Sequence, residues 1–144
     1  MCWTPLVQRH VQANWTQQSP KPLSANPAQL RQLKMAELDT RQIRKLNDQA
    51  RRSFKGCRVV ITRGIAELDE HVISAIAAQV RSYDQFTPDN DPYREHDFGS
   101  FHHGAVHVFW KWDYYDLDFA MRSPDPSDPS VTARVLTIML ADEY

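Results

Sequence analysis

Apolar side chains recur with helical spacing in two segments of this chain, residues 40–55 and 69–83. At about 100° per residue the apolar positions of each segment fall on one face, which predicts two amphipathic helices. In the first segment these positions are Ile43, Leu46, Ala50 and Phe54, and the basic residues of the opposite face are Arg41, Arg44, Lys45, Arg52 and Lys55. In the second they are Val72, Ile73, Ile76, Ala77, Val80 and Tyr83. Asp39 or Thr40 can cap the start of the first helix, and Gly56 can end it.

Two other segments are typical of β-strands. Residues 57–62, CRVVIT, form a short β-branched run, which favours a buried strand. Residues 105–112 alternate between two faces, with Val106, Val108, Trp110 and Trp112 on one of them. Residues 114–119 could return beside this strand as a hairpin partner, although the turn lacks glycine.

The last apolar segment follows a loop rich in proline, SPDPSDPS at residues 123–130. Asp128 at the cap and Pro129 at the first helical position are typical of a helix start. The apolar residues that follow cover well over half of a helix circumference, which predicts a third helix that is buried on most sides. They are Val131, Val135, Leu136, Ile138, Met139 and Leu140.

The order helix, strand, helix, strand, strand, helix predicts an α+β domain at residues 39–144, with a small, mostly antiparallel sheet packed against three helices. A parallel βαβ start is the alternative, since a strand, a helix and a strand follow one another. Residues 1–38 contain four prolines and little apolar periodicity, so we expect an N-terminal arm that is flexible or partly helical. A chain of 144 residues with 42% hydrophobic content suits a single domain.

The composition also bears on the compartment. The chain has no apolar run of about 18 residues and no signal-like start, so neither a membrane span nor a secretory signal is supported. We expect a cytoplasmic protein. Its two cysteines, Cys2 and Cys57, could form a disulfide, but two reduced thiols are the favoured state, and the sequence holds no redox or zinc motif.

The net charge of −1 hides two halves of opposite sign. Residues 1–65 contain twelve Lys or Arg and three Asp or Glu, whereas residues 66–144 contain five and fifteen. This asymmetry is compatible with internal complementarity, with an acidic face for a basic partner, or with a nucleic-acid surface. Internal complementarity is the favoured reading. Nucleic-acid binding is less favoured, because the aromatic residues lie in the acidic half, where phosphate would be repelled.

The segment of residues 86–97, FTPDNDPYREHD, concentrates four carboxylates and a histidine. Pro88 and Pro92 prevent a continuous helix and leave these side chains on turns. Like charges crowded in a rigid loop repel one another, so a cation, a basic partner or a basic part of the same chain should balance them. The expected binding surface combines this segment with the end of the long strand: Asp89, Asp91, Glu95, Asp97, Asp113, Tyr114, Tyr115 and Asp116.

The same residues suggest two chemical hypotheses. Glu95, Asp97 and Asp113 could supply oxygen ligands for a divalent cation such as Mg²⁺ or Mn²⁺. His96 stands between two carboxylates that could orient its ring for general acid–base work, with Glu95 as the second catalytic candidate. The spacing fits no metal-binding loop. The favoured alternative is therefore that no cofactor binds and that the carboxylates cap turns or pair with arginines.

Several unusual strings follow one another in order: NDPYREHDFG, WKWDYYD, SPDPSDP and RVLTIMLADEY. They resemble an uncharacterised bacterial domain family, one of the domains of unknown function, over residues 43–144. The resemblance implies a small protein of bacterial chromosomes, plasmids or other mobile elements. It brings no activity and no catalytic residue.

The function we expect is that of a small non-enzymatic binding or regulatory protein, which docks a protein partner with a basic surface through its acidic, aromatic surface. The resemblance adds that a mobile element could encode it and that the partner could be a host or defence protein. The alternative is a metal-dependent hydrolase that acts on phosphodiesters. The oligomeric state stays open at this level.

Overall fold

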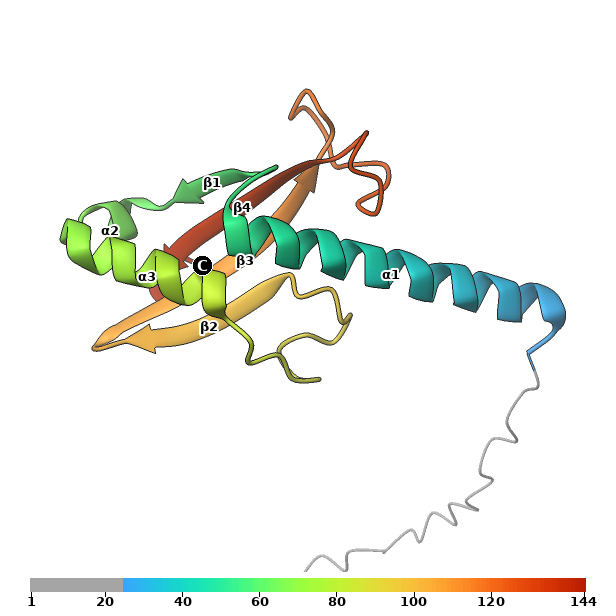
Figure 1. Cartoon of the computed structure of the whole chain (residues 1–144), viewed down its shortest axis with the longest axis horizontal. Helices are drawn as coiled ribbons and strands as arrows, with labels where there is room; N and C mark the ends of the chain where they lie inside the picture. The colour runs from blue at the N-terminus through green and yellow to red at the C-terminus, as the bar shows by residue number, and fades with distance from the viewer. Residues whose placement is uncertain (1–24) are drawn as a thin grey trace, which may run out of the picture.

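The computed structural model describes residues 25–144. It contains the helices α1 (Pro27–Ser53), α2 (Arg63–Ala66) and α3 (Glu70–Ser82), the strands β1 (Arg58–Ile61), β2 (Phe98–His103), β3 (Val106–Tyr115) and β4 (Ala133–Leu140), and the final 3-10 helix η1 (Ala141–Glu143). The predicted α+β class, with a small, mostly antiparallel sheet and three helices, is confirmed (Figure 1). Most of the predicted N-terminal arm, residues 1–24, lies outside the described residues.

The four strands form one sheet in the order β1-β4-β3-β2. The long strand β3 pairs antiparallel with both β2 and β4, so that Trp110 lies between Gly99 and Ile138. The short strand β1 runs parallel to β4 at the edge. Helices α1 and α3 lie on the same face of the sheet (Figure 1).

The core lies between α3, the end of α1 and this face of the sheet. Ile76 and Val80 of α3 belong to one buried cluster with Val108 and Trp110 of β3. Burying an aliphatic side chain of this size contributes about 1.5–3 kcal/mol, so this layer fixes α3 on the sheet. The position opposite Trp110 must be glycine, because a Cβ atom at Gly99 would overlap the indole ring.

Helix α1 starts earlier than its apolar periodicity predicts. The Asn26 side chain accepts a hydrogen bond from the Gln29 backbone N–H, the Gln29 side chain accepts one from the Asn26 backbone N–H, and Pro27 occupies the first helical position. The predicted start near residue 40 was therefore wrong. All residues from 26 to 39 are exposed, and the helix buries side chains only from Ile43 onward. Apolar periodicity reveals only the part of a helix that packs against the rest of the protein.

The predicted C-terminal helix was wrong: its residues form β4, an inner strand of the sheet. A strand covered on both faces is apolar at consecutive positions and loses the alternation that would reveal it. Consecutive residues of β4, including Val135, Leu136, Ile138 and Met139, are buried. The third helix is instead the short α2.

The strand predictions were right for β3 and partly right elsewhere. Tyr114 and Tyr115 continue β3 and do not return as a hairpin. The strand that forms a hairpin with β3 is β2, which the pattern missed. Strand β1 is present, but all four of its residues are exposed, because it lies at the edge of the sheet. It pairs with β4 and not with the strand that follows α3, so the alternative parallel βαβ start does not form.

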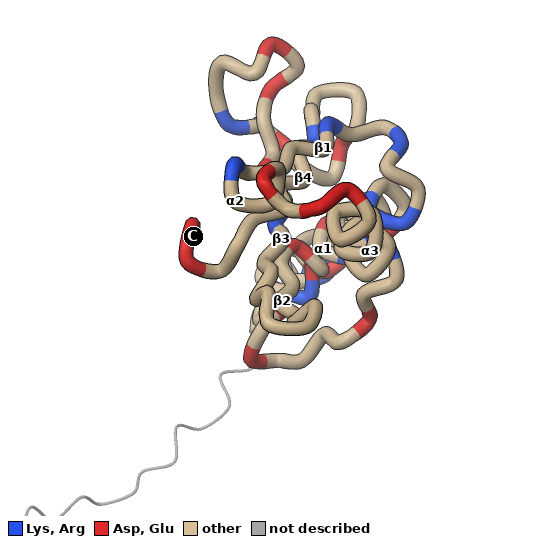
Figure 2. Tube along the Cα trace, turned by 90° about the vertical axis from the view of Figure 1, so that its left-hand side faces the viewer, with Lys and Arg blue, Asp and Glu red and all other residues tan. Residues whose placement is uncertain are grey.

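Basic and acidic side chains meet where α1 approaches the loop between α3 and β2. Figure 2 shows acidic positions in the loops and at the C-terminal end, with basic positions among them. Asp48 and Arg51 of α1 lie in this contact region, where Asp48 also reaches His96 of the loop. Within residues 25–144, no helix has the length and apolar character needed to cross a membrane.

Candidate functional site

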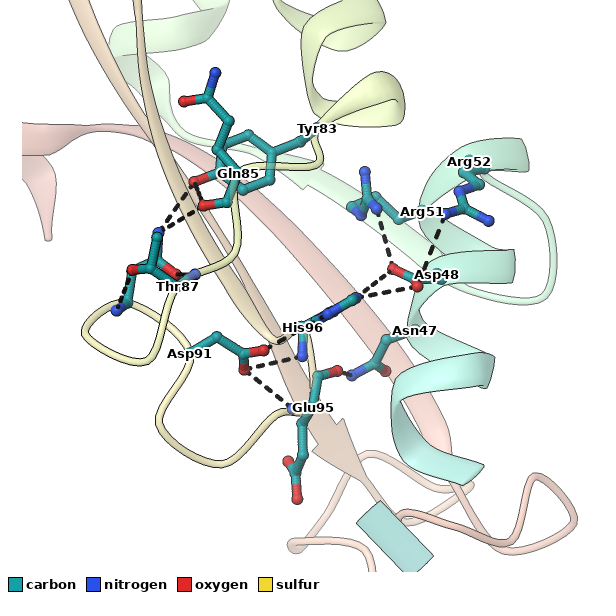
Figure 3. A network of polar contacts seen from close by, with 11 residues as sticks. Asn47, Asp48, Arg51, Arg52, Tyr83, Gln85, Thr87, Asp91, Glu95 and His96 are labelled. Carbon is teal, nitrogen blue, oxygen red and sulfur yellow. Dashed lines mark hydrogen bonds and ion pairs between the residues drawn. The ribbon is translucent and has the colours of Figure 1, made fainter. Parts of the chain in front are cut away.

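The polar centre of the molecule lies where α1 meets the loop of residues 83–97 (Figure 3). Asn47, Asp48 and Arg51 approach the loop from α1, where residues three and four apart share one side of the helix. Asn47 and Arg51 are fully buried. The helix therefore places polar groups in its contact with the loop, where purely apolar packing was expected.

Asp48 holds the ring of His96. The two Asp48 carboxylate oxygens lie 3.1 and 3.0 Å from His96 Nδ1, and since a carboxylate only accepts hydrogen bonds, Nδ1 carries a proton. The other ring nitrogen, Nε2, lies 3.7 Å from Asp91 Oδ2. The Phe86 ring stacks flat on the imidazole, with the ring centroids 3.7 Å apart. Three neighbours thus fix the position of His96.

Arg51 links α1 to the end of α3. Its guanidinium donates hydrogen bonds to Asp48 Oδ1 at 3.0 Å and to the carbonyl oxygens of Val80 and Arg81 at 2.7 and 3.2 Å. These carbonyls belong to the last turn of α3, where a cation is favourable. Burial lowers the pKa of Arg51, and Asp48 opposes that shift. A buried charge needs partners, so Arg51 and Asp48 depend on each other.

Asp91 shapes the backbone of the loop. Its side chain is 5% exposed, and its Oδ1 accepts hydrogen bonds from the backbone N–H groups of Glu95 at 3.0 Å and His96 at 3.1 Å. Arg94 and His96 adopt left-handed conformations with φ of 58° and 52°, which are unfavourable for residues other than glycine. The hydrogen bonds to Asp91 offset this strain. Figure 3 shows that Glu95 and His96 consequently point in different directions.

Asn47 connects the helix to both the loop and the sheet. Its Nδ2 donates hydrogen bonds to the Glu95 carbonyl at 2.9 Å and to the Tyr114 hydroxyl at 2.6 Å, and its Oδ1 accepts one from Arg134 Nε at 3.2 Å. Burial raises the pKa of Tyr114, the negative charges of Glu95 and Asp97 act in the same direction, and Asn47 opposes them. Tyr114, predicted as a surface residue, is therefore part of this internal network.

Glu95 and Asp97 differ from the other carboxylates of the site. Both are partly buried, and neither forms an ion pair with any residue of the described part of the chain. Burial raises the pKa of Glu95, and the charges of Asp97 and Asp91 raise it further. Burial also raises the pKa of Asp97, and the charge of Asp91 raises it further. The backbone N–H of Asp97 and the charge of His96 lower this pKa. We call these two residues the Glu95–Asp97 pair.

The three predicted metal ligands are not brought together. Strand pairing places Asp97 opposite Trp112, whose N–H donates to the Asp97 carbonyl at 2.8 Å, so the next residue, Asp113, points to the other face of the sheet. There Asp113 pairs with Lys111 at 3.1 Å. Within residues 25–144, no three His, Cys, Asp or Glu side chains are arranged to hold a metal ion. The divalent-cation hypothesis thus gains no assembled ligand set from this geometry.

The other predicted binding residues lie apart from the Glu95–Asp97 pair. Asp116 accepts a hydrogen bond from the Ala120 backbone N–H at 2.8 Å and so shapes the turn after β3. The ring of Tyr115 lies 6.2 Å from that of Phe119, between centroids. Asp89 is exposed at the tip of the loop. The predicted acidic surface is therefore divided between the helix side and the opposite side of the sheet.

Sequence reasoning missed Asn47 and Asp48 because nothing local connects them to a loop more than forty residues away. One signal was present: Asn47 occupies the apolar arc of its helix, between Ile43 and Ala50. A polar residue on a buried stripe requires a hydrogen-bond partner from another element. The partners themselves could not be read from the sequence.

Comparison with known families gives one finding. A family model described as a protein of unknown function (DUF3768) matches residues 61–143, which include the loop, β3 and β4 but not α1. The match therefore begins later than the resemblance predicted from residue 43. Comparison with curated proteins and with solved structures gives no match.

Proposed function

Because the chain belongs to the DUF3768 family of proteins of unknown function, which brings no activity with it, we propose a function from the geometry alone. The protein is a non-enzymatic binding protein that receives a basic side chain of a protein partner at the Glu95–Asp97 pair. The partner has a basic surface, and an arginine or lysine of that surface is the group recognised.

The observation that supports this proposal is that neither Glu95 nor Asp97 forms an ion pair among residues 25–144. Asp48, in contrast, contacts two arginines and His96, at distances from 3.0 to 3.9 Å. Burial and mutual repulsion make the charged forms of Glu95 and Asp97 unfavourable, as the raised pKa of each group indicates. A guanidinium or ammonium group would relieve both effects.

The surroundings of the pair suit a protein partner. Tyr114 is near enough for the charges of Glu95 and Asp97 to raise its pKa, and Tyr93 of the same loop is 74% exposed. Tyrosine is enriched in protein interfaces, and charge complementarity accelerates the encounter of two partners. The wider proposal of a host or defence protein as partner, and of a mobile element as the source of the gene, rests on the resemblance alone.

Quantitative capture from a bacterial lysate tests the proposal. The full chain is compared with the double variant Glu95→Gln/Asp97→Asn and with a control, Asp113→Asn/Asp118→Asn, which changes the net charge equally at other places. We expect proteins that bind the wild type and the control but not the Glu95–Asp97 variant, with binding that weakens as salt increases. Equal capture by the wild type and by both double variants would exclude this site.

A second candidate function is hydrolysis of phosphodiesters with His96 as general base. One observation favours it: Asp48 holds Nδ1 of His96, which is how a carboxylate orients a catalytic histidine. Hydrolysis of bis(p-nitrophenyl) phosphate, with and without Mn²⁺, tests it. An activity that His96→Gln leaves unchanged, or no activity under either condition, would contradict this candidate.

A further inference from the structure

A cavity of about 300 Å³ lies between α1 and the loop. Arg44 of α1 lines it together with Phe86, Asp91, Arg94 and His96 of the loop and two prolines. The apolar periodicity of α1 assigned Arg44 to the solvent-facing side of the helix. The structure places it at a concave surface instead, which is also lined by Arg94 of the loop.

The lining carries an excess of positive charge. Neither Arg44 nor Arg94 forms an ion pair within residues 25–144, whereas Arg51 and Arg52 nearby both contact Asp48. The carboxylate that lines the cavity, Asp91, uses Oδ1 to accept two backbone N–H groups. The cavity lining thus contains two guanidinium groups and one carboxylate, and that carboxylate already accepts hydrogen bonds from the backbone.

The loop backbone holds this arrangement in place. Arg94 and His96 have left-handed backbone conformations, and the hydrogen bonds to Asp91 maintain them. Two such residues within three positions are unusual outside glycine, and strained conformations of this kind concentrate at binding sites. Phe86 and His96, which both line the cavity, stack on each other and so hold this part of its lining rigid.

We propose that this cavity binds the phosphate group of a small molecule, with Arg44 and Arg94 as its two ligands from the protein. A carboxylate is matched by a single guanidinium fork, whereas a tetrahedral phosphate dianion can accept hydrogen bonds from two guanidinium groups on separate elements. Phe86 and His96 also line the cavity, where an aromatic or apolar part of the same ligand can pack. This site is independent of the Glu95–Asp97 pair.

Titration of the full chain, followed by ¹H–¹⁵N NMR at constant ionic strength, tests the site with three probes: inorganic phosphate, phenyl phosphate and acetate. We expect saturable shifts of the residue 94–96 amides with phosphate. Arg44→Gln and Arg94→Gln should each weaken binding at least about tenfold, the scale of a lost charged hydrogen bond. Arg41→Gln is the control, since Arg41 pairs with Glu37 on the exposed part of α1.

The outcomes separate the ligand sources. Tighter binding of phenyl phosphate than of inorganic phosphate supports a phosphate ester, and equal binding supports free phosphate. The proposal is overturned by non-saturable shifts, by acetate binding as tightly as phosphate, or by Arg44→Gln and Arg94→Gln variants that bind like the wild type. Melting temperatures of both variants close to that of the wild type ensure that a loss of binding reports on the cavity and not on folding.

Discussion

Two pairs of carboxylates lie around the same loop, and they differ in what surrounds each oxygen. Asp48 and Asp91 face inward, where Arg51, His96 and backbone N–H groups donate to them. The Glu95–Asp97 pair is partly buried and forms no ion pair with another of the residues 25–144. The first pair holds the loop on α1, and the second is the site at which we propose that a basic partner binds. Hydrogen-bond and ion-pair partners thus distinguish the two pairs more clearly than charge density does.

The strongest test of the inward pair is Arg51→Ala. It removes a fully buried cation, leaves Asp48 without its closest arginine and frees two carbonyls at the end of α3. Breaking a buried pair from one side costs about 3–5 kcal/mol, so urea unfolding should show a loss of that size. The matched control is Arg52→Ala, because the Arg52 side chain is 67% exposed and lies 3.9 Å from the same carboxylate. An equally large loss of stability for Arg52→Ala would show that burial and distance to Asp48 do not determine how much an arginine stabilises the fold.

Asp91→Ala should have the next largest effect. It removes the acceptor of two backbone N–H groups and the support for two left-handed residues, which we expect to lower the free energy of unfolding by about 2–3 kcal/mol. Asp91→Asn keeps an acceptor oxygen and should lose less. Asp89→Ala changes an exposed carboxylate of the same loop and should stay within about 0.5 kcal/mol of the wild type. Equal losses for Asp89→Ala and Asp91→Ala would refute this role of Asp91.

Removing a charge from the Glu95–Asp97 pair should raise the free energy of unfolding, whereas the changes to the inward pair lower it. This gain is expected only at higher pH. Because folding raises the pKa of Glu95 above its ordinary 4.5, the charged form destabilises the folded state. This cost is absent below pH 4.5, grows as the pH rises and is complete above the folded pKa. Glu95→Gln should therefore stabilise the protein by roughly 0.5 kcal/mol at pH 7 and not at pH 3.5.

Chemical unfolding of wild type and Glu95→Gln at both pH values measures this difference. Asp113→Asn serves as the control, since Asp113 already has Lys111 beside it. A Glu95→Gln variant that is less stable than the wild type at pH 7 would mean that the charge of Glu95 is compensated within the chain. The reason for proposing a basic partner would then disappear.

The same contrast explains which parts of the fold the sequence could predict. Helix α3 and strand β3 each have one covered face, so their apolar positions repeat with a clear period. Strand β4 is covered on both faces and lost that period, and β2, with the sequence FGSFHH, has few apolar residues to reveal it. Pattern therefore predicts elements with one covered face better than a strand covered on both faces or a strand with few apolar residues.

For the site, the sequence predicted the segment but not the arrangement within it. The sequence singled out residues 86–97 because prolines and carboxylates concentrate there, and the structure brings this segment against α1. Which carboxylate would face inward depends on Asp48 and Arg51, which reach the loop only through the packing of α1. Arg44 was misplaced for the same reason, since helix periodicity does not reveal a neighbouring loop.

The smallest change in the free energy of unfolding is expected for Asp113→Asn, which is the reference for the other variants. Asp113 pairs with Lys111 at 3.1 Å, but the two side chains are 33% and 36% exposed, so water screens their attraction. Exposed pairs of this kind contribute about 0–1 kcal/mol, and we expect a change below about 0.5 kcal/mol in urea unfolding at pH 7. Lys111→Met should behave alike, because either change breaks the same weak contact. A larger loss for either variant would show that the opposite face of the sheet also carries a structural charge, and Asp113 could then no longer serve as a neutral control for the Glu95–Asp97 pair.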